Sequence, residues 1–119
     1  MRKIERQKLQ AIVDNKDWSK DNTRVEYNGD LTDCDQAFFS VYLHGHKIAV
    51  YYPKDQTLYI NHCGWKTVTT KSRLNALISF VQGGLSGIYQ KNFEWFVKRV
   101  DNGDGSVHEY PMPNAWLLV

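Results

Sequence analysis

The sequence predicts a single α+β domain in which an antiparallel β-sheet packs against one central helix, with a short helix at the N-terminus. Residues 37–62 are rich in β-branched and aromatic side chains interrupted by turn residues, which is typical of consecutive strands. Residues 70–82 instead repeat apolar side chains at helical spacing, and residues 85–100 again resemble a hairpin. The length of 119 residues fits one domain with its own core.

Residues 1–20 are expected to form an amphipathic helix or an arm, with cations around one apolar stripe. That stripe consists of Ile4, Leu9, Ile12 and Val13. The chain is then polar and rich in turn residues, with a short strand expected at 24–27 before the Asn28-Gly29 turn. Residues 37–119 are expected to form the sheet, helix and sheet of the core.

The core is expected to begin with a three-stranded antiparallel meander, interrupted at Gly45 and at the Pro53-Lys54-Asp55 turn. Its strands are predicted at 37–44, 46–52 and 57–62. The central helix should begin near Thr70, because Thr69 or Thr70 can cap it, and it should end at Gly83-Gly84. Its apolar positions are Leu74, Leu77, Ile78 and Val81.

The segment after the helix predicts a second hairpin, which turns at Lys91-Asn92. Residues 101–106 form another expected turn before a short strand at 107–110. The last residues, 115–119, have apolar side chains, so we expect them to pack against the sheet.

The charge is small in total but uneven along the chain. The formal net charge is +2, which is too small to indicate nucleic-acid binding by itself. Residues 14–35 hold seven acids and three bases, a balance of −4, whereas residues 66–99 hold six bases and one acid, a balance of +5. This uneven distribution of charge indicates either two solvated faces or a basic surface that binds an anionic partner.

The N-terminus carries no apolar signal segment, and no stretch is long enough to span a membrane, so we expect a cytoplasmic protein. The two cysteines, Cys34 and Cys63, are then expected to be reduced thiols, although a single disulfide would also fit the sequence.

The stretch "GWKTVTTKSRLN", residues 64–75, places hydroxyls and cations where a strand runs into a helix. The start of a helix has unpaired N–H groups and a positive dipole end, so this junction suits a phosphate. The candidate anion-binding residues are Lys66, Thr67, Thr69, Thr70, Lys71, Arg73 and Asn75. The alternative is a well-capped helix in which Lys71 and Arg73 are solvated and Asn75 bonds locally.

Exposed aromatic side chains would strengthen a nucleic-acid interpretation, because bases stack on them. Trp65 is the candidate within the junction. Further candidates are Tyr51, Tyr59, Tyr89 and Trp95. Strand alternation should bury about half of the aromatic residues in a sheet.

Other chemistry has less support. His44, His46, His62 and Cys63 match no standard zinc spacing, so no metal and no cofactor is predicted. The loop "DNGDGSVHE" resembles a calcium loop, but Gly103 stands where an oxygen ligand belongs. Neither cysteine lies in a recognisable nucleophile motif, and we expect no enzymatic activity.

The central motif, Gly-Trp-x-Thr-x-Thr-Thr-Lys-x-Arg-Leu-Asn at residues 64–75, resembles a family of small bacteriophage-encoded proteins. Two flanking motifs extend this likeness: Leu-His-Gly at 43–45 with Ile-Ala at 48–49, and Gln-Lys-Asn-Phe-x-Trp at 90–95. The resemblance covers about half of the chain. It implies an origin in an infected bacterium, where small accessory proteins bind and redirect host machinery, and it favours a binding protein over a catalyst.

Two functions are therefore expected. The first is an accessory protein that binds nucleic acid or a nucleoprotein complex through the basic junction. The second is a protein-directed inhibitor of a host enzyme or defence system, such as a CRISPR nuclease complex, that uses an acidic surface. Its acidic residues would be Asp14, Asp17, Asp21, Asp30, Asp33 and Asp35.

Overall fold

The computed structural model describes residues 3–14, 16–30, 33–83, 86–101 and 103–119, with the backbone alone at Asp30 and 33–36. Within these ranges it has two helices and nine strands, and the expected α+β class is confirmed. The elements are α1 (Lys3–Val13), β1 (Trp18–Lys20), β2 (Thr23–Asp30), β3 (Asp33–Leu43), β4 (His46–Tyr52), β5 (Thr57–Ile60), α2 (Val68–Gln82), β6 (Gly87–Lys91), β7 (Glu94–Val100), β8 (Val107–Pro111) and β9 (Leu117–Leu118).

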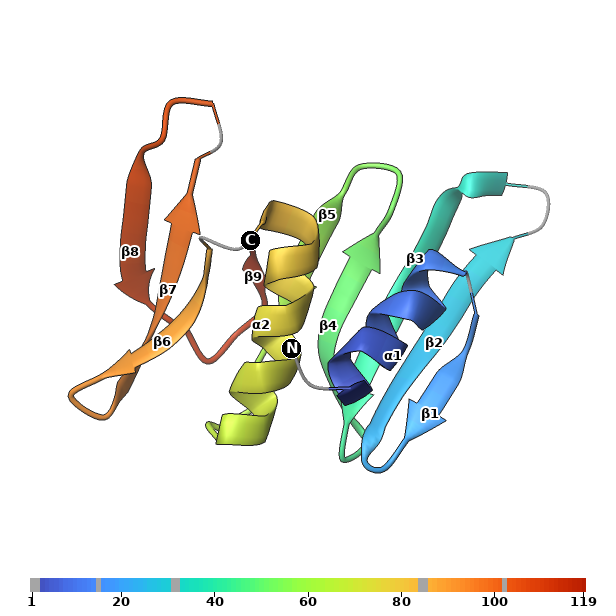
Figure 1. Ribbon diagram of the computed structural model, residues 1–119, viewed down its shortest axis with the longest axis horizontal. Helices are drawn as coiled ribbons and strands as arrows, with labels where there is room; N and C mark the ends of the chain where they lie inside the picture. The colour runs from blue at the N-terminus through green and yellow to red at the C-terminus, as the bar shows by residue number, and fades with distance from the viewer. Residues whose placement is uncertain (1–2, 15, 31–32, 84–85, 102) are drawn as a thin grey trace.

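The larger sheet is an antiparallel meander in the order β1-β2-β3-β4-β5-β9. Figure 1 shows α1 in front of β2 and β3 and α2 in front of β5, so the two helices cover the same face. Because side chains alternate along a strand, every second residue of β2, β3 and β5 points toward this layer. The fully buried residues there include Val25, Phe39, Val41, Leu58 and Ile60.

A second antiparallel sheet, β6-β7-β8, lies on the other side of α2 (Figure 1). The side chain of Asn75 in α2 forms two hydrogen bonds with the backbone of the edge strand β6, as a neighbouring strand would. The Ile88 N–H donates to Asn75 Oδ1 over 2.6 Å, and Asn75 Nδ2 donates to the Ile88 carbonyl over 3.0 Å. A Cβ on Gly87 would lie 2.9 Å from Asn75 Oδ1, so this close approach requires glycine. Asn75 therefore holds the second sheet to the central helix.

The central helix begins two residues earlier than predicted. Its N-cap is Thr67, whose extended backbone (φ −111°) precedes Val68 and whose hydroxyl accepts from the Thr70 N–H over 3.1 Å. The prediction that Thr69 or Thr70 caps the helix was wrong. The predicted end at Gly83 is confirmed, since Gly83 has φ +89° and its N–H donates to the Ser79 carbonyl.

The N-terminal helix is confirmed, but its polar side is not all solvated. Val13, expected in the apolar stripe, is 60% exposed, whereas Lys8 and Glu5 are buried. Glu5 Oε1 accepts from Lys8 Nζ at 3.3 Å and from Arg73 Nη1 at 3.2 Å. This buried ionic cluster joins α1 to α2.

Further differences concern strands and turns. Asn28 and Gly29, predicted to form a turn, lie within β2. The short strand β1 was not predicted, and β3 begins four residues before the predicted 37. The β6–β7 hairpin turns at Asn92-Phe93, one residue later than expected, since Lys91 pairs with Glu94. The C-terminal residues do pack on the sheet, as β9 pairs with β5 and Val119 is buried. None of the helices in the described residues has the length and apolar character needed to span a membrane.

Candidate functional site

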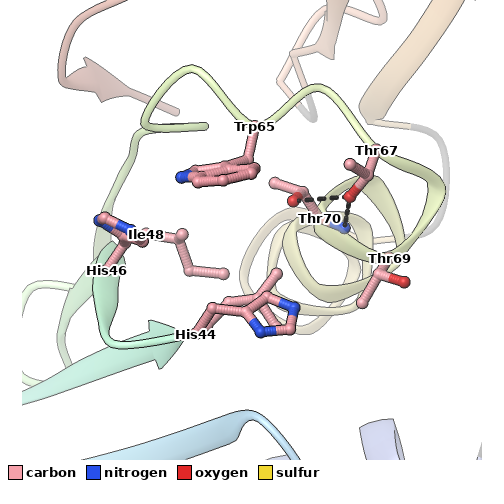
Figure 2. Close-up of a pocket in the computed structure, with 8 residues that line it drawn as sticks. His44, His46, Ile48, Trp65, Thr67, Thr69 and Thr70 are labelled. Carbon is pink, nitrogen blue, oxygen red and sulfur yellow. Dashed lines mark hydrogen bonds between the residues drawn. The ribbon is translucent and has the colours of Figure 1, made fainter.

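A cleft of about 430 Å³ opens between the β3–β4 turn and the start of α2. Its lining residues are Leu43, His44, His46, Ile48, Trp65, Thr67, Thr69 and Thr70. Figure 2 shows the Trp65 ring on one side, the two histidine rings on others and the helix start opposite His46. The cleft combines aromatic walls with one hydroxyl-rich end.

Trp65 is presented by a tightly turned loop between β5 and α2. The Cys63 N–H donates to Asn61 Oδ1 (2.8 Å), and the Gly64 N–H donates to His62 Nδ1 (2.9 Å). The Trp65 N–H then donates to the His62 carbonyl (2.9 Å). These bonds fix the loop while the Trp65 side chain stays 53% exposed.

The two histidines reach the cleft from the β3–β4 hairpin. His44 and Gly45 form its two-residue turn, with φ of +51° and +80°, the type I′ geometry that suits antiparallel strands. The His46 ring lies 5.7 Å from the Trp65 ring, centroid to centroid, at a tilt of 42°. From the sequence we considered these histidines only as possible metal ligands. In the structure they line the same cleft as Trp65.

The hydroxyl-rich end of the cleft is the first turn of α2. The hydroxyls of Thr67 and Thr70 lie 3.0 Å apart, and Thr67 also accepts from the Thr70 N–H. Thr69 lies beside them on the lining. The first N–H groups of a helix have no acceptor within the helix, so this end of the cleft is electropositive.

The predicted cations divide between the surface and the core. Lys66 is exposed and Lys71 is half-buried, both next to the cleft residues. Arg73, in contrast, is buried, with its Nη1 on Glu5 and its Nε donating to Thr23 Oγ1 over 2.9 Å. The capped-helix alternative expected Arg73 to be solvated, and this was wrong, because its guanidinium pairs with the buried Glu5 carboxylate.

The structure thus gathers four of the eight predicted residues at the cleft, and two more are sequence neighbours of lining residues. Trp65, Thr67, Thr69 and Thr70 line the cleft, and Lys66 and Lys71 flank it in sequence. Arg73 and Asn75 serve the packing of α2 against α1 and β6.

The proposed stacking aromatics differ widely in exposure. Trp95 and Tyr51 are buried, and Tyr59 is 37% exposed. The most exposed aromatic in the described part of the chain is Phe93, at 94%, at the tip of the β6–β7 hairpin. Sequence reasoning missed it, although its neighbour Asn92 belongs to the residue types that favour such turns.

His62 is buried and forms part of the scaffold of the loop. Its ring meets the Trp95 ring edge-on with centroids 5.9 Å apart, and Nδ1 accepts from the Gly64 N–H. Burial, and secondly the nearby Lys66 cation, lowers the pKa of His62 below its ordinary value. His62 is therefore neutral near pH 7 and supports the loop that carries Trp65.

No set of three His, Cys, Asp or Glu side chains suited to hold a metal ion occurs among the described residues. Cys63 is a free thiol 3.2 Å from the Lys47 carbonyl, and burial raises its pKa, which disfavours a thiolate. The side chain of Cys34 lies outside the described residues, so its expected reduced state is not addressed.

The acidic segment is described only in part. Asp14, Asp17 and Asp21 are exposed, and Asp17 accepts from the Tyr27 N–H over 2.7 Å. The side chains of Asp30, Asp33 and Asp35 lie outside the described residues.

Comparison with known proteins gives one family. The family model described as Kyanoviridae Gp96 protein matches residues 1–116, so the match extends well beyond the half of the chain covered by the motifs. The comparisons with curated proteins and with solved structures each give no match.

Proposed function

We propose that the chain, which belongs to the Kyanoviridae Gp96 protein family, a family of phage proteins, acts by binding nucleic acid or a nucleoprotein complex through the cleft at the start of α2. The observation that carries this proposal is the half-exposed Trp65 indole, which forms a wall of a cleft that ends at a helix N-terminus. The proposal assigns no catalytic role and places the protein in the cytoplasm of the infected bacterium.

The shape of the cleft suits a nucleobase. Its volume of about 430 Å³ is within the range of pockets that hold small ligands. A base that enters beside Trp65 can stack on the indole and meet the ring of His46, which lies 5.7 Å from the indole at an angle of 42°. Base stacking on an aromatic side chain contributes about 1–3 kcal/mol per base.

The hydroxyl-rich end suits the phosphate next to that base. The Thr69 hydroxyl and the free N–H groups of the first turn can donate to phosphate oxygens. Thr67 and Thr70 shape this end but are engaged with one another. Lys66 and Lys71 supply the long-range attraction, without the buried Arg73.

Fluorescence anisotropy with labelled single-stranded DNA and RNA tests the proposal. Trp65→Ala should weaken binding by about tenfold or more, whereas Trp116→Ala should not, although Trp116 is similarly exposed (46%). Substitution of both Lys66 and Lys71 by Ala should reduce the slope of log affinity against log salt by about 0.7 per cation lost. Lys16→Ala, at another exposed position, is the matched control.

Two results would reject this function. One is that the wild-type protein binds no oligonucleotide at low salt. The other is that Trp65→Ala and Trp116→Ala bind equally well.

The exposed Asp14, Asp17 and Asp21 support a second candidate, a protein-directed inhibitor of a host enzyme or defence system. Capture of host proteins from nuclease-treated and untreated lysate separates the two. A partner lost on nuclease treatment favours nucleic acid. One stoichiometric protein kept in both, and lost when the three aspartates are replaced by lysine, favours the inhibitor.

A further inference from the structure

Phe93 occupies a backbone conformation that phenylalanine disfavours, at the most exposed point of a hairpin. Asn92 and Phe93 have φ of +52° and +67°, so they form the central pair of a two-residue turn between Lys91 and Glu94. Bulky residues are rare in the left-handed region, and Asn-Gly is the usual pair here. The Phe93 side chain, 94% exposed, gains little packing in return. A disfavoured backbone conformation together with an exposed aromatic ring indicates a residue that contacts a partner.

The hairpin tip borders a second hollow. This open depression of about 700 Å³ is lined by Lys71, Ile88, Tyr89, Gln90, Asn92 and Phe93. Lys71 follows Thr69 and Thr70 of the cleft directly, so the two hollows lie on either side of the same helical turn. Figure 1 shows the β6–β7 turn, the start of α2 and the β3–β4 turn along the lower edge of the molecule, in this order from the left.

The charges beside Phe93 favour an anionic partner. Lys71 lies in the hollow and Lys91 is exposed at the hairpin, opposed there by Glu94. Gln90 and Asn92 on the lining carry amides that can donate hydrogen bonds, whereas the Tyr89 hydroxyl already donates to Glu109 over 3.1 Å. Aromatic platforms separated by cations are typical of single-strand binding surfaces.

Taken with the proposed function, on which this step rests, the geometry points to a single-stranded nucleic acid that runs from the Trp65 cleft past Lys71 to the β6–β7 hairpin. One base stacks on Trp65 and another, further along the strand, on Phe93. Bases of a duplex are stacked on one another and cannot reach both rings, so the ligand is an unpaired segment of nucleic acid.

The test compares wild type with Phe93→Gly, in which glycine suits the positive φ and keeps the turn. Anisotropy is measured with a short and a long labelled single strand, of about 4 and about 16 nucleotides, and with a duplex of the longer sequence. Phe93→Gly should weaken binding of the long strand by about tenfold and that of the short strand by much less. The long strand should also bind wild type more tightly than the duplex does.

The outcomes separate this inference from the proposed function. If Phe93→Gly binds the long strand like wild type while Trp65→Ala does not, the path to the hairpin is wrong and the cleft stands. If the duplex binds as tightly as the long single strand, the assignment of an unpaired ligand is wrong. If Phe93→Gly leaves oligonucleotide binding intact but loses a protein captured from nuclease-treated lysate, Phe93 belongs to a protein contact instead.

Discussion

The guanidinium of Arg73 lies 3.2 Å from the carboxylate of Glu5, with side chains that are 8% and 2% exposed. The same carboxylate accepts from the fully buried Lys8, whose ammonium also donates to the Arg73 carbonyl over 2.9 Å. These three charges connect residues 68 positions apart and hold the N-terminal helix to the start of α2. The helix turn beneath the proposed binding surface is thus anchored from inside.

Arg73→Ala should lower the free energy of unfolding by about 3–5 kcal/mol, because it leaves the Glu5 carboxylate buried with Lys8 as its one charged partner among the described residues. Urea denaturation measures this loss. Lys71→Ala, two residues away and half-buried at the surface, should change stability by about 0.5 kcal/mol or less. A stable Arg73→Ala protein would contradict the structural role of the cluster. Binding tests should accordingly vary Lys66 and Lys71 and leave Arg73 in place.

Lys8 should make stability depend on pH in the alkaline range. Burial, opposed by the charge of Glu5, lowers the pKa of Lys8 from its ordinary 10.5 to about 8. Between these values the unfolded chain keeps a proton that the folded protein releases, so the free energy of unfolding rises with pH. The shift corresponds to about 3 kcal/mol over the whole window.

The measurement compares wild type with Lys8→Met in urea from about pH 7 to about pH 10, since other groups titrate equally in both. Lys8→Met removes one partner of the buried Glu5 carboxylate and the bond to the Arg73 carbonyl, and the stability of wild type relative to Lys8→Met should increase as the pH rises through this window. Parallel pH profiles would show that Lys8 keeps an ordinary pKa in the folded protein.

The local elements were predictable because their signals are local. Helical spacing from Leu74 to Val81 and the β-rich run after Ala37 identified α2 and the meander. The strand β1 was missed because it has only three residues, of which Trp18 alone favours a strand, and its place is set by pairing with β2. The first residues of β3 are mostly polar, and Asp33 is held there by pairing with Asp30 of β2. Such pairing depends on the partner strand rather than on the segment itself.

For a similar reason, the burial of Lys8 and Arg73 could not be predicted from the sequence. A cation on an amphipathic helix normally faces water, and only the meeting of α1 with α2 brings Glu5 to both. At the candidate site, Trp65 and the threonines were identified from the junction alone. The histidines were not placed with them, since contact between the β3–β4 turn and the junction is a tertiary relationship.

Thr67→Ala should destabilise the protein by about 1 kcal/mol, because Thr67 is the N-cap and accepts from the Thr70 N–H. Thr67→Ser should retain most of that stability, and Thr69→Ala, which leaves the cap intact, should have a small effect. Hydrogen exchange of the Thr70 amide provides a local measurement and should be faster in Thr67→Ala alone. Equal losses in Thr67→Ala and Thr69→Ala would contradict this assignment of the cap.

Phe93→Gly should stabilise the protein while it weakens binding. In the left-handed region a residue with a Cβ is disfavoured by about 1–2 kcal/mol, and the change creates the Asn-Gly pair preferred in this type of turn. Glycine adds entropy to the unfolded chain, so the expected net gain is about 1 kcal/mol in urea or thermal denaturation. Phe93→Ala is the control, since it removes the ring but keeps the Cβ and should gain little. If Phe93→Gly were instead less stable than wild type, Phe93 would have a role in packing, and its exposure would no longer indicate a binding residue.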